Sequence, residues 1–488
     1  MTALAALGAF LAFPIAAQAQ GTAQGVTPPS TKGVVPKGRA PVSKEVLKVK
    51  LPPATEAHLP NGAHLMVLED RRAPQVSVQI FIPGAGGYFD PAGMSGLATF
   101  TASQMREGTA RWTTTQLNEE LERLAANVSV SAGVSGTEAV INVSALPEHL
   151  DRVMDIAVDV LLHPTFPEAE FARYKQRTKA SLQQQRSNPG FLLAEAASGV
   201  MYGNHPASRV SLSAEALDKV TRADLVAFHQ SKFVPDHAAI AVTGDISMTE
   251  ARKLVETKLA GWKRANTAVP ETIDPPMPGA PKVHFVGRPD SVQTNLSVAA
   301  PGISRTSKDF DVLGVMNKVL GGGPTGRLFI VLREDKGYTY GAYSGVTAGL
   351  YRGDWTASTS VRTDVTEPAL TDLMAEIARM RDEKVPAEDL ETAKRAIVAA
   401  FALSLESPQA IMGYHLTRWR YKLPVDYWEK EPQRVMAVTA DQVQAAAVQY
   451  LAPSKLHIVA VGDPAKVADA LAKFGVMVKY DTEGKVIK

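Results

Sequence analysis

Cysteine does not occur in this chain of 488 residues. Its absence excludes disulfide bridges, iron–sulfur clusters, thiolate zinc sites and cysteine nucleophiles. Excess charge is absent too, because 52 Lys and Arg nearly balance 50 Asp and Glu. A net charge of +2 gives no reason to propose nucleic acid as the main partner. The ten histidines never lie three or four residues apart, which excludes a zinc site built on one helical turn.

Long apolar runs are also missing after the first twenty residues, so we expect no transmembrane segment in the mature chain. Residues 1–19 are apolar and end in Ala17-Gln18-Ala19, which is typical of a signal peptide cleavage site. Residues 20–50 are rich in Pro, Gly, Thr and Lys, a composition that predicts a basic tether. We therefore expect an exported, periplasmic protein.

The chain matches itself at an offset of 218 residues. The matched positions include Val220-Thr221 with Val438-Thr439, Pro83-Gly84 with Pro301-Gly302, and Gly244-Asp245 with Gly462-Asp463. Agreement at both ends of so long a unit predicts two copies of one domain, residues 51–267 and 283–488. Between them, residues 268–282 contain five prolines, which suits a linker because proline interrupts helices and central strands alike.

Each copy shows the same alternation of elements. In the first, residues 76–82 predict a strand, a helix follows from about Met94, and residues 127–131 and 139–146 predict a pair of strands. Near the end of each copy, Thr221 with Asp224 and Thr439 with Gln442 have the spacing of helix N-caps. Antiparallel strands with helices on one face indicate an α+β fold.

Two runs of residues resemble the pitrilysin/insulinase family of zinc peptidases. The first is Phe81–Gly84 followed by Gly93–Ala98, and the second is Gly321–Gly323 followed by Gly326–Phe329 and Leu332–Tyr340. The resemblance covers residues 52–488. It implies two tandem αβ-roll halves and, as in short-chain members, a clamshell that two such proteins form around a peptide.

The zinc motif of that family is degenerate here. Family members carry His-x-x-Glu-His on the helix after the first run, and a third ligand, a glutamate, one helix later. In this chain Thr99 and Ser103 fill the histidine slots, Ala102 fills the glutamate slot, and the third ligand falls at or near Ala180. Hydroxyl groups are poor zinc ligands and alanine cannot take a proton from water. The resemblance therefore implies a chain with no metal of its own.

The second half carries candidate functional residues of another kind, Arg333 and Tyr340. Residues 329–335 predict the last turns of a helix, Gly337 its cap, and residues 338–346 a strand, so Arg333 and Tyr340 can converge. In the family, an Arg and a Tyr at this spacing reach the zinc site across the clamshell, hold the substrate backbone and stabilise the oxyanion. The residues alone favour a plainer reading, in which Arg333 complements a helix dipole and Tyr340 packs on a sheet.

Three further segments have weaker readings. Gly321, Gly322 and Gly323 fail as a phosphate loop because Arg and Leu follow where Lys and a hydroxyl residue are required. They predict a flexible loop, and the family resemblance implies that this loop touches the substrate. Residues 412–420 predict either a cavity wall or a half-buried helix. His229 and His237 predict surface or packing residues.

Together these observations predict the zinc-free subunit of a heterodimeric periplasmic metallopeptidase. A homologous partner would bring His-x-x-Glu-His and zinc, and this chain would not be active alone. A closed chamber admits short or unfolded chains, so peptides are the expected substrates. The alternative is a non-catalytic scaffold or a peptide-binding pseudopeptidase.

Overall fold

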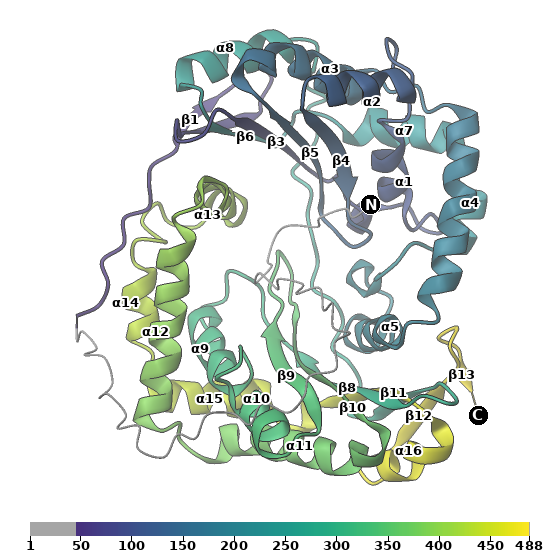
Figure 1. Ribbon diagram of the computed structural model, residues 1–488, viewed down its shortest axis with the longest axis vertical. Helices are drawn as coiled ribbons and strands as arrows, with labels where there is room; N and C mark the ends of the chain where they lie inside the picture. The colour runs from purple at the N-terminus through teal and green to yellow at the C-terminus, as the bar shows by residue number, and fades with distance from the viewer. Residues whose placement is uncertain (1–44, 488) are drawn as a thin grey trace, which may run out of the picture.

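The computed structural model describes residues 45–487, and the expected signal peptide and most of the expected tether lie outside this range. Two sheets stand at opposite ends of the molecule (Figure 1). The first has the order β1 (Thr55–His58), β2 (His64–Glu69), β6 (Ala239–Gly244), β3 (Val76–Pro83), β5 (Glu138–Ala145) and β4 (Asn127–Ala132). The second has the order β13 (Val486–Ile487), β12 (Met477–Tyr480), β7 (Val283–Gly287), β11 (His457–Gly462), β8 (Gln293–Pro301), β10 (Asp354–Arg362) and β9 (Thr339–Val346).

The helices follow the same two-part plan. The first half carries α1 (Leu97–Gln104), α2 (Thr114–Arg123), α3 (Leu150–Leu162), α4 (Glu168–Gln185), α5 (Pro189–Tyr202), α6 (Ala214–Lys219), α7 (Arg222–Lys232) and α8 (Met248–Lys258). The second carries α9 (Phe310–Leu320), α10 (Arg327–Phe329), α11 (Thr366–Asp382), α12 (Ala387–Ser404), α13 (Pro408–Tyr421), α14 (Glu431–Met436), α15 (Ala440–Tyr450) and α16 (Pro464–Ala472). Short helical turns are η1 (Gly87–Phe89), η2 (Pro147–His149), η3 (Pro206–Ser208), η4 (Ile330–Asp335), η5 (Thr363–Val365) and η6 (Pro453–Lys455).

The sequence repeat is also a repeat of structure. Helix α7 and strand β6 recur 218 residues later as α15 and β11, and the strand order β2-β6-β3-β5-β4 recurs as β7-β11-β8-β10-β9. The expected N-caps are confirmed, because Thr221 with Asp224 and Thr439 with Gln442 each form a reciprocal capping box. The α+β class predicted from the sequence is confirmed as well.

Both sheets are mixed, which corrects the expectation of antiparallel strands. β2 pairs with β6 in parallel, and β7 pairs in parallel with β11 and β12. β2 lies beside β6 and β7 beside β11, and the long stretch of chain between the two strands of each pair lets them run in the same direction.

Helices also cover both faces of each sheet, not one. Strand residues of the first sheet alternate between a core with that half's own helices and a second core that contains Met66 and Phe81. The second core is completed by Met412 and Leu416 of α13, which belongs to the other half. Conversely, Leu192 of α5 packs on the second sheet. The two halves are therefore interlocked by an exchange of one helix each.

The proline-rich segment 268–282, here called the strap, contains no helix or strand and is anchored to both halves. The Ile273 N–H donates to the Tyr88 hydroxyl at 2.9 Å, and His205 Nε2 lies 3.0 Å from the Ile273 carbonyl oxygen. From the other half, the Arg352 guanidinium donates to the carbonyls of Pro275 and Pro276 at 2.7 and 2.8 Å. The strap is thus held by its backbone and by the Asp274 carboxylate, which accepts from the Arg352 N–H at 2.7 Å.

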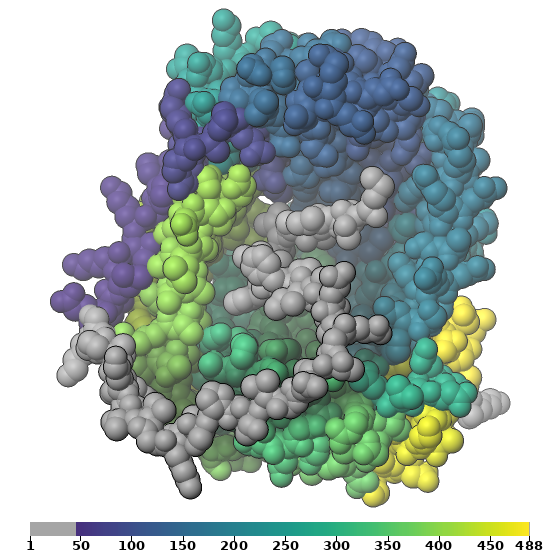
Figure 2. Space-filling view, in the orientation of Figure 1, coloured from purple at the N-terminus to yellow at the C-terminus, as the bar shows by residue number. Residues whose placement is uncertain are grey.

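Between the halves, the face seen in Figure 2 is hollowed. Within residues 45–487, no single helix is long and apolar enough to cross a membrane. The bent pair α12 and α13 passes that test by length and composition at an angle of 110°, but α13 is the helix that packs on the first sheet.

Candidate functional site

The residues in the zinc slots make contacts within the protein. Asp90 caps α1 by accepting from the N–H groups of Gly96 at 2.6 Å and Ala98 at 2.8 Å, and burial raises the pKa of this carboxyl to about 6. On α1 itself, the Thr99 hydroxyl donates to the carbonyl of Ala132 at 2.8 Å. The start of this helix is therefore fixed by internal hydrogen bonds.

The other two α1 slots are equally unsuited to a metal. Ala102 is buried, and the Ser103 hydroxyl oxygen lies 3.4 Å from the Tyr174 hydroxyl of α4. Ala180, six residues beyond Tyr174 on α4, is exposed. No group of three His, Cys, Asp or Glu side chains that could hold a metal ion occurs in residues 45–487. The residues present do not fit a zinc ion.

Arg333 stands in an irregular helical segment. Residues Ile330–Asp335 form a π-helix, not the α-helical turns expected from the sequence. Gly337, with φ +62°, ends it, and the N–H groups of Gly337 and Tyr338 donate to the carbonyls of Arg333 and Leu332. The Arg333 side chain is 46% exposed and its guanidinium lies 4.7 Å from the Phe329 ring centroid. A π-helical turn is rare and occurs often at functional sites.

Tyr340 stands in a second irregularity. Between β9 and β10 the pairing shifts by one residue, so Tyr340 and Gly341 of β9 oppose Ser360 alone on β10, which is a β-bulge. The Thr339 hydroxyl fixes this bulge by donating to the Ser360 carbonyl at 2.7 Å. Tyr340 is left 90% exposed on an edge strand. Such a side chain is presented outward and does not pack on the sheet.

Arg333 and Tyr340 therefore lie on either side of the Gly337 reversal, with both polar ends open to solvent. No hydrogen bond joins them within the described residues. Their convergence on one substrate stays a prediction. Chemically, the pair offers a fixed positive charge and a neutral hydroxyl donor to a group that is not part of this chain.

The three-glycine loop is tightly packed, in contrast with the flexible loop expected. The Ser344 N–H of β9 donates to the Gly321 carbonyl at 2.9 Å, and a Cβ on Gly321 would lie 2.6 Å from the Ser344 hydroxyl oxygen. A Cβ on Gly322 would lie 2.8 Å from the Lys318 Cα. These glycines allow α9 and β9 to approach closely, and Gly323 has a positive φ of 146°.

The remaining sequence candidates make contacts within the protein. His229 is buried in part, and its Nε2 lies 2.7 Å from the Leu161 carbonyl oxygen. His237 Nε2 lies 2.9 Å from the Thr267 carbonyl oxygen. Residues 412–420 belong to α13, so the half-buried helix explains Met412, although Trp419 lines a cavity described below.

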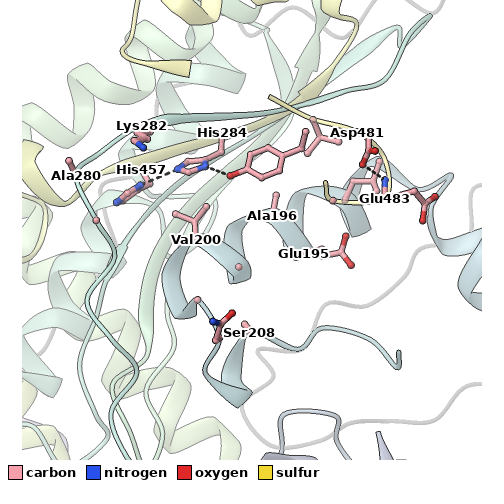
Figure 3. A pocket seen from close by; sticks show the side chains of 18 residues that line it. Glu195, Ala196, Val200, Ser208, Ala280, Lys282, His284, His457, Asp481 and Glu483 are labelled. Carbon is pink, nitrogen blue, oxygen red and sulfur yellow. Dashed lines mark hydrogen bonds between the residues drawn. The ribbon is translucent and has the colours of Figure 1, made fainter. Parts of the chain in front are cut away.

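Sequence reasoning missed a buried chain of polar side chains on the second sheet. Figure 3 shows His284 beside His457 at the wall of a cavity of about 610 Å³ that residues of α5 also line, and Tyr480 lines the same cavity. His284 Nδ1 lies 2.9 Å from the Tyr480 hydroxyl, and its Nε2 lies 3.3 Å from His457 Nδ1. Burial, then the neighbouring His457, lower the pKa of His284 to about 4. These residues are far apart in sequence, so no local sequence pattern predicts that they meet.

Comparison with known families gives two matches that together span most of the described chain. Residues 65–214 match the family model described as Insulinase (Peptidase family M16). Residues 219–397 match the model described as Peptidase M16 inactive domain.

Individual relatives agree with these matches. An uncharacterized zinc protease of Bacillus subtilis, YmxG, is 22% identical over 354 residues, which cover 72% of this chain and 85% of that protein. The mitochondrial-processing peptidase subunit alpha of Solanum tuberosum is 23% identical and covers 80% of this chain and 78% of its own length. The crystal structure of a peptidase M16 inactive domain from Pseudomonas fluorescens superposes with a TM-score of 0.77 at 27% identity, over 84% of this chain and 98% of that one.

Proposed function

Because the chain belongs to the insulinase (M16) peptidase family, and its zinc slots do not fit a metal, we propose that it is the non-metal-binding subunit of a two-chain zinc metallopeptidase. A homologous partner carries His-x-x-Glu-His, and its zinc ion, when bound, supplies the activated water. This chain supplies Arg333 and Tyr340 together with part of the wall around the substrate. We place the complex in the periplasm on the strength of residues 1–19.

The observation that carries the proposal is the contrast between the two halves. In the first, Thr99, Ala102 and Ser103 contact the protein itself. In the second, a π-helix and a β-bulge hold Arg333 and Tyr340 in the open. Irregular backbone costs stability, and it is concentrated where side chains must be aimed at a ligand. The relative from Solanum tuberosum, named a subunit of a processing peptidase, supports a paired arrangement.

The chemistry assigned to this chain is binding and charge stabilisation. The Arg333 guanidinium and the Tyr340 hydroxyl donate hydrogen bonds to a substrate carbonyl, and both bonds strengthen as negative charge develops on its oxygen. The hollow between the halves supports peptides as substrates, since a hollow that a second chain closes would admit extended chains and not folded domains.

Reconstitution tests the proposal. Mixed with a zinc-bearing homologue, this chain should switch on peptide hydrolysis, and Arg333→Ala or Tyr340→Phe should each lower kcat by about 100-fold, the usual loss when one oxyanion donor is removed. Lys336→Ala and Tyr343→Phe, which change exposed neighbours, are the matched controls.

Two results would refute the proposal. The chain alone could hold stoichiometric zinc by elemental analysis and cleave peptides, in which case it would be a complete enzyme. Alternatively, full activity in both the Arg333 and Tyr340 variants would leave a non-catalytic scaffold as the better account.

A further inference from the structure

A second cavity, here called the α13 pocket, lies between α13, the face of the first sheet that α13 covers, and the start of the strap. Its volume is about 470 Å³, and its walls include Phe81 of β3, Leu416 and Trp419 of α13, and Pro270 of the strap. That volume is within the range of small-ligand sites. Neither Arg333 nor Tyr340 lines it.

Much of the wall is apolar and part of it is open. Val269 is 56% exposed and Leu350 is 40% exposed at this pocket. Further along the wall, the rings of His64 and Trp419 lie parallel within 7° at a centroid distance of 6.4 Å. Exposed apolar side chains beside aromatic rings suit the apolar or aromatic part of a ligand.

The charged groups of the pocket are unbalanced. The carboxylate of Glu138 is engaged by the Arg420 guanidinium and by the Thr137 hydroxyl. By contrast, the exposed Lys422 forms no ion pair, and the His58 side chain forms no hydrogen bond, with any other residue in the described range. One ammonium group therefore lacks a counter-charge, which favours a ligand that carries a carboxylate.

The backbone of Lys422 is also strained. Lys422 follows α13 in the left-handed conformation, with φ +52°, at a position where glycine would be unstrained. His237, with φ +63°, also lines this pocket. Strained residues of this kind are concentrated at ligand sites, where the side chain justifies the strained backbone.

We infer that the α13 pocket binds the C-terminal end of a peptide whose last residue has a large apolar or aromatic side chain, with its carboxylate on Lys422. The choice of a peptide over another apolar acid rests on the proposed function. A C-terminal residue carries its carboxylate and its side chain on one carbon. A single residue can therefore place its carboxylate on the Lys422 ammonium group and its side chain on the apolar part of the wall. The peptide is then held by its end, away from Arg333 and Tyr340.

Calorimetry on this chain alone tests the inference with three probes: N-acetylphenylalanine, its neutral amide, and octanoate. The acid should bind about tenfold more tightly than the amide, and more tightly than octanoate. Lys422→Gln should bring the acid and the amide within about twofold. Lys430→Gln is the matched control, because Lys430 is exposed, pairs with Asp426 and does not line the pocket.

Lys422→Gly distinguishes the effect of the Lys422 charge from the effect of its strained backbone. It should lose the selectivity for the acid and raise the midpoint of thermal unfolding, whereas Lys422→Gln should lose the selectivity without that rise. Equal binding of acid and amide by the unaltered chain, unchanged selectivity in Lys422→Gln, or tighter binding of octanoate would each overturn the inference. Tyr340→Phe should leave acid binding unchanged, so a failure of the two-chain enzyme and a failure of the pocket are distinguishable.

Discussion

Replacing His284 with glutamine should remove a pH-dependent part of the stability of the second half. His284 is 7% exposed, and burial lowers its pKa to about 4 from an ordinary value of 6.5. Between these two pH values the unfolded chain binds a proton that the folded chain does not. Stability therefore falls as the pH drops from 6.5 to 4, and His284 contributes its full share only above pH 6.5.

The magnitude follows from the size of the shift. About 2.5 pKa units at 1.36 kcal/mol per unit amount to about 3 kcal/mol. Glutamine does not titrate, so His284→Gln should be less stable than the unaltered protein at pH 7, and this gap should shrink by about 3 kcal/mol towards pH 4.

The quantity to measure is the difference in unfolding free energy between the variant and the unaltered protein, because other buried groups change the stability with pH in the opposite direction. Burial raises the pKa of Asp90 to about 6 and that of Glu431 to about 7. Each of these carboxyls binds its proton more tightly in the folded protein, so each destabilises the fold as the pH rises. Both are present in the variant and in the unaltered protein, and they cancel in the difference.

Urea unfolding followed by circular dichroism between pH 7.5 and 4.5 measures that difference. A gap that stays constant within about 0.5 kcal/mol over this range would refute the reasoning, since surface substitutions alone vary by that much. His163→Gln, at an exposed position, is the control for the substitution itself.

Three other perturbations test the fold around the site. Gly337→Ala should destabilise the protein by about 1 to 2 kcal/mol in thermal unfolding, because φ is +62° there, and it should also lower reconstituted activity. His205→Ala or Tyr88→Phe should release the strap, seen as faster proteolytic cleavage within residues 268–282, whereas His205→Gln keeps a donor and an acceptor and should not. Burial lowers the pKa of His205, so strap cleavage in the unaltered protein should increase as the pH falls below 6.5 towards that lowered pKa, while the glutamine variant stays flat. Leu416→Ala should lower the free energy of unfolding by about 2 to 4 kcal/mol. Because α13 joins the two halves, both halves should still unfold together in a single transition.

Local patterns were sufficient to predict much of the element order. The strand expected at residues 76–82 is β3, and the pair expected at 127–131 and 139–146 is β4 with β5. Period-two alternation, capping threonines and helix-ending prolines act over a few residues, so the sequence displays them directly.

Long-range geometry was not predictable in the same way. The parallel pairing of β2 with β6 joins strands at opposite ends of one repeat, and the exchange of α5 and α13 joins the two repeats. The His284 and His457 pair spans 173 positions. None of these leaves a periodic signal, because each depends on how whole sheets and helices are placed.

The two halves also differ in where the backbone is irregular, and this difference carries the functional reading further than the residue types do. At α1, regular helical turns follow the left-handed Gly93 and Gly96, and Thr99 and Ala102 contribute to packing. In the second half, a π-helix, a left-handed glycine and a bulge follow one another between Ile330 and Gly341. Arg333 as a mere helix-dipole partner and Tyr340 as a sheet residue would need none of these features. A regular helix and a flat strand would serve those roles at lower cost, so the irregular geometry favours side chains aimed at a substrate.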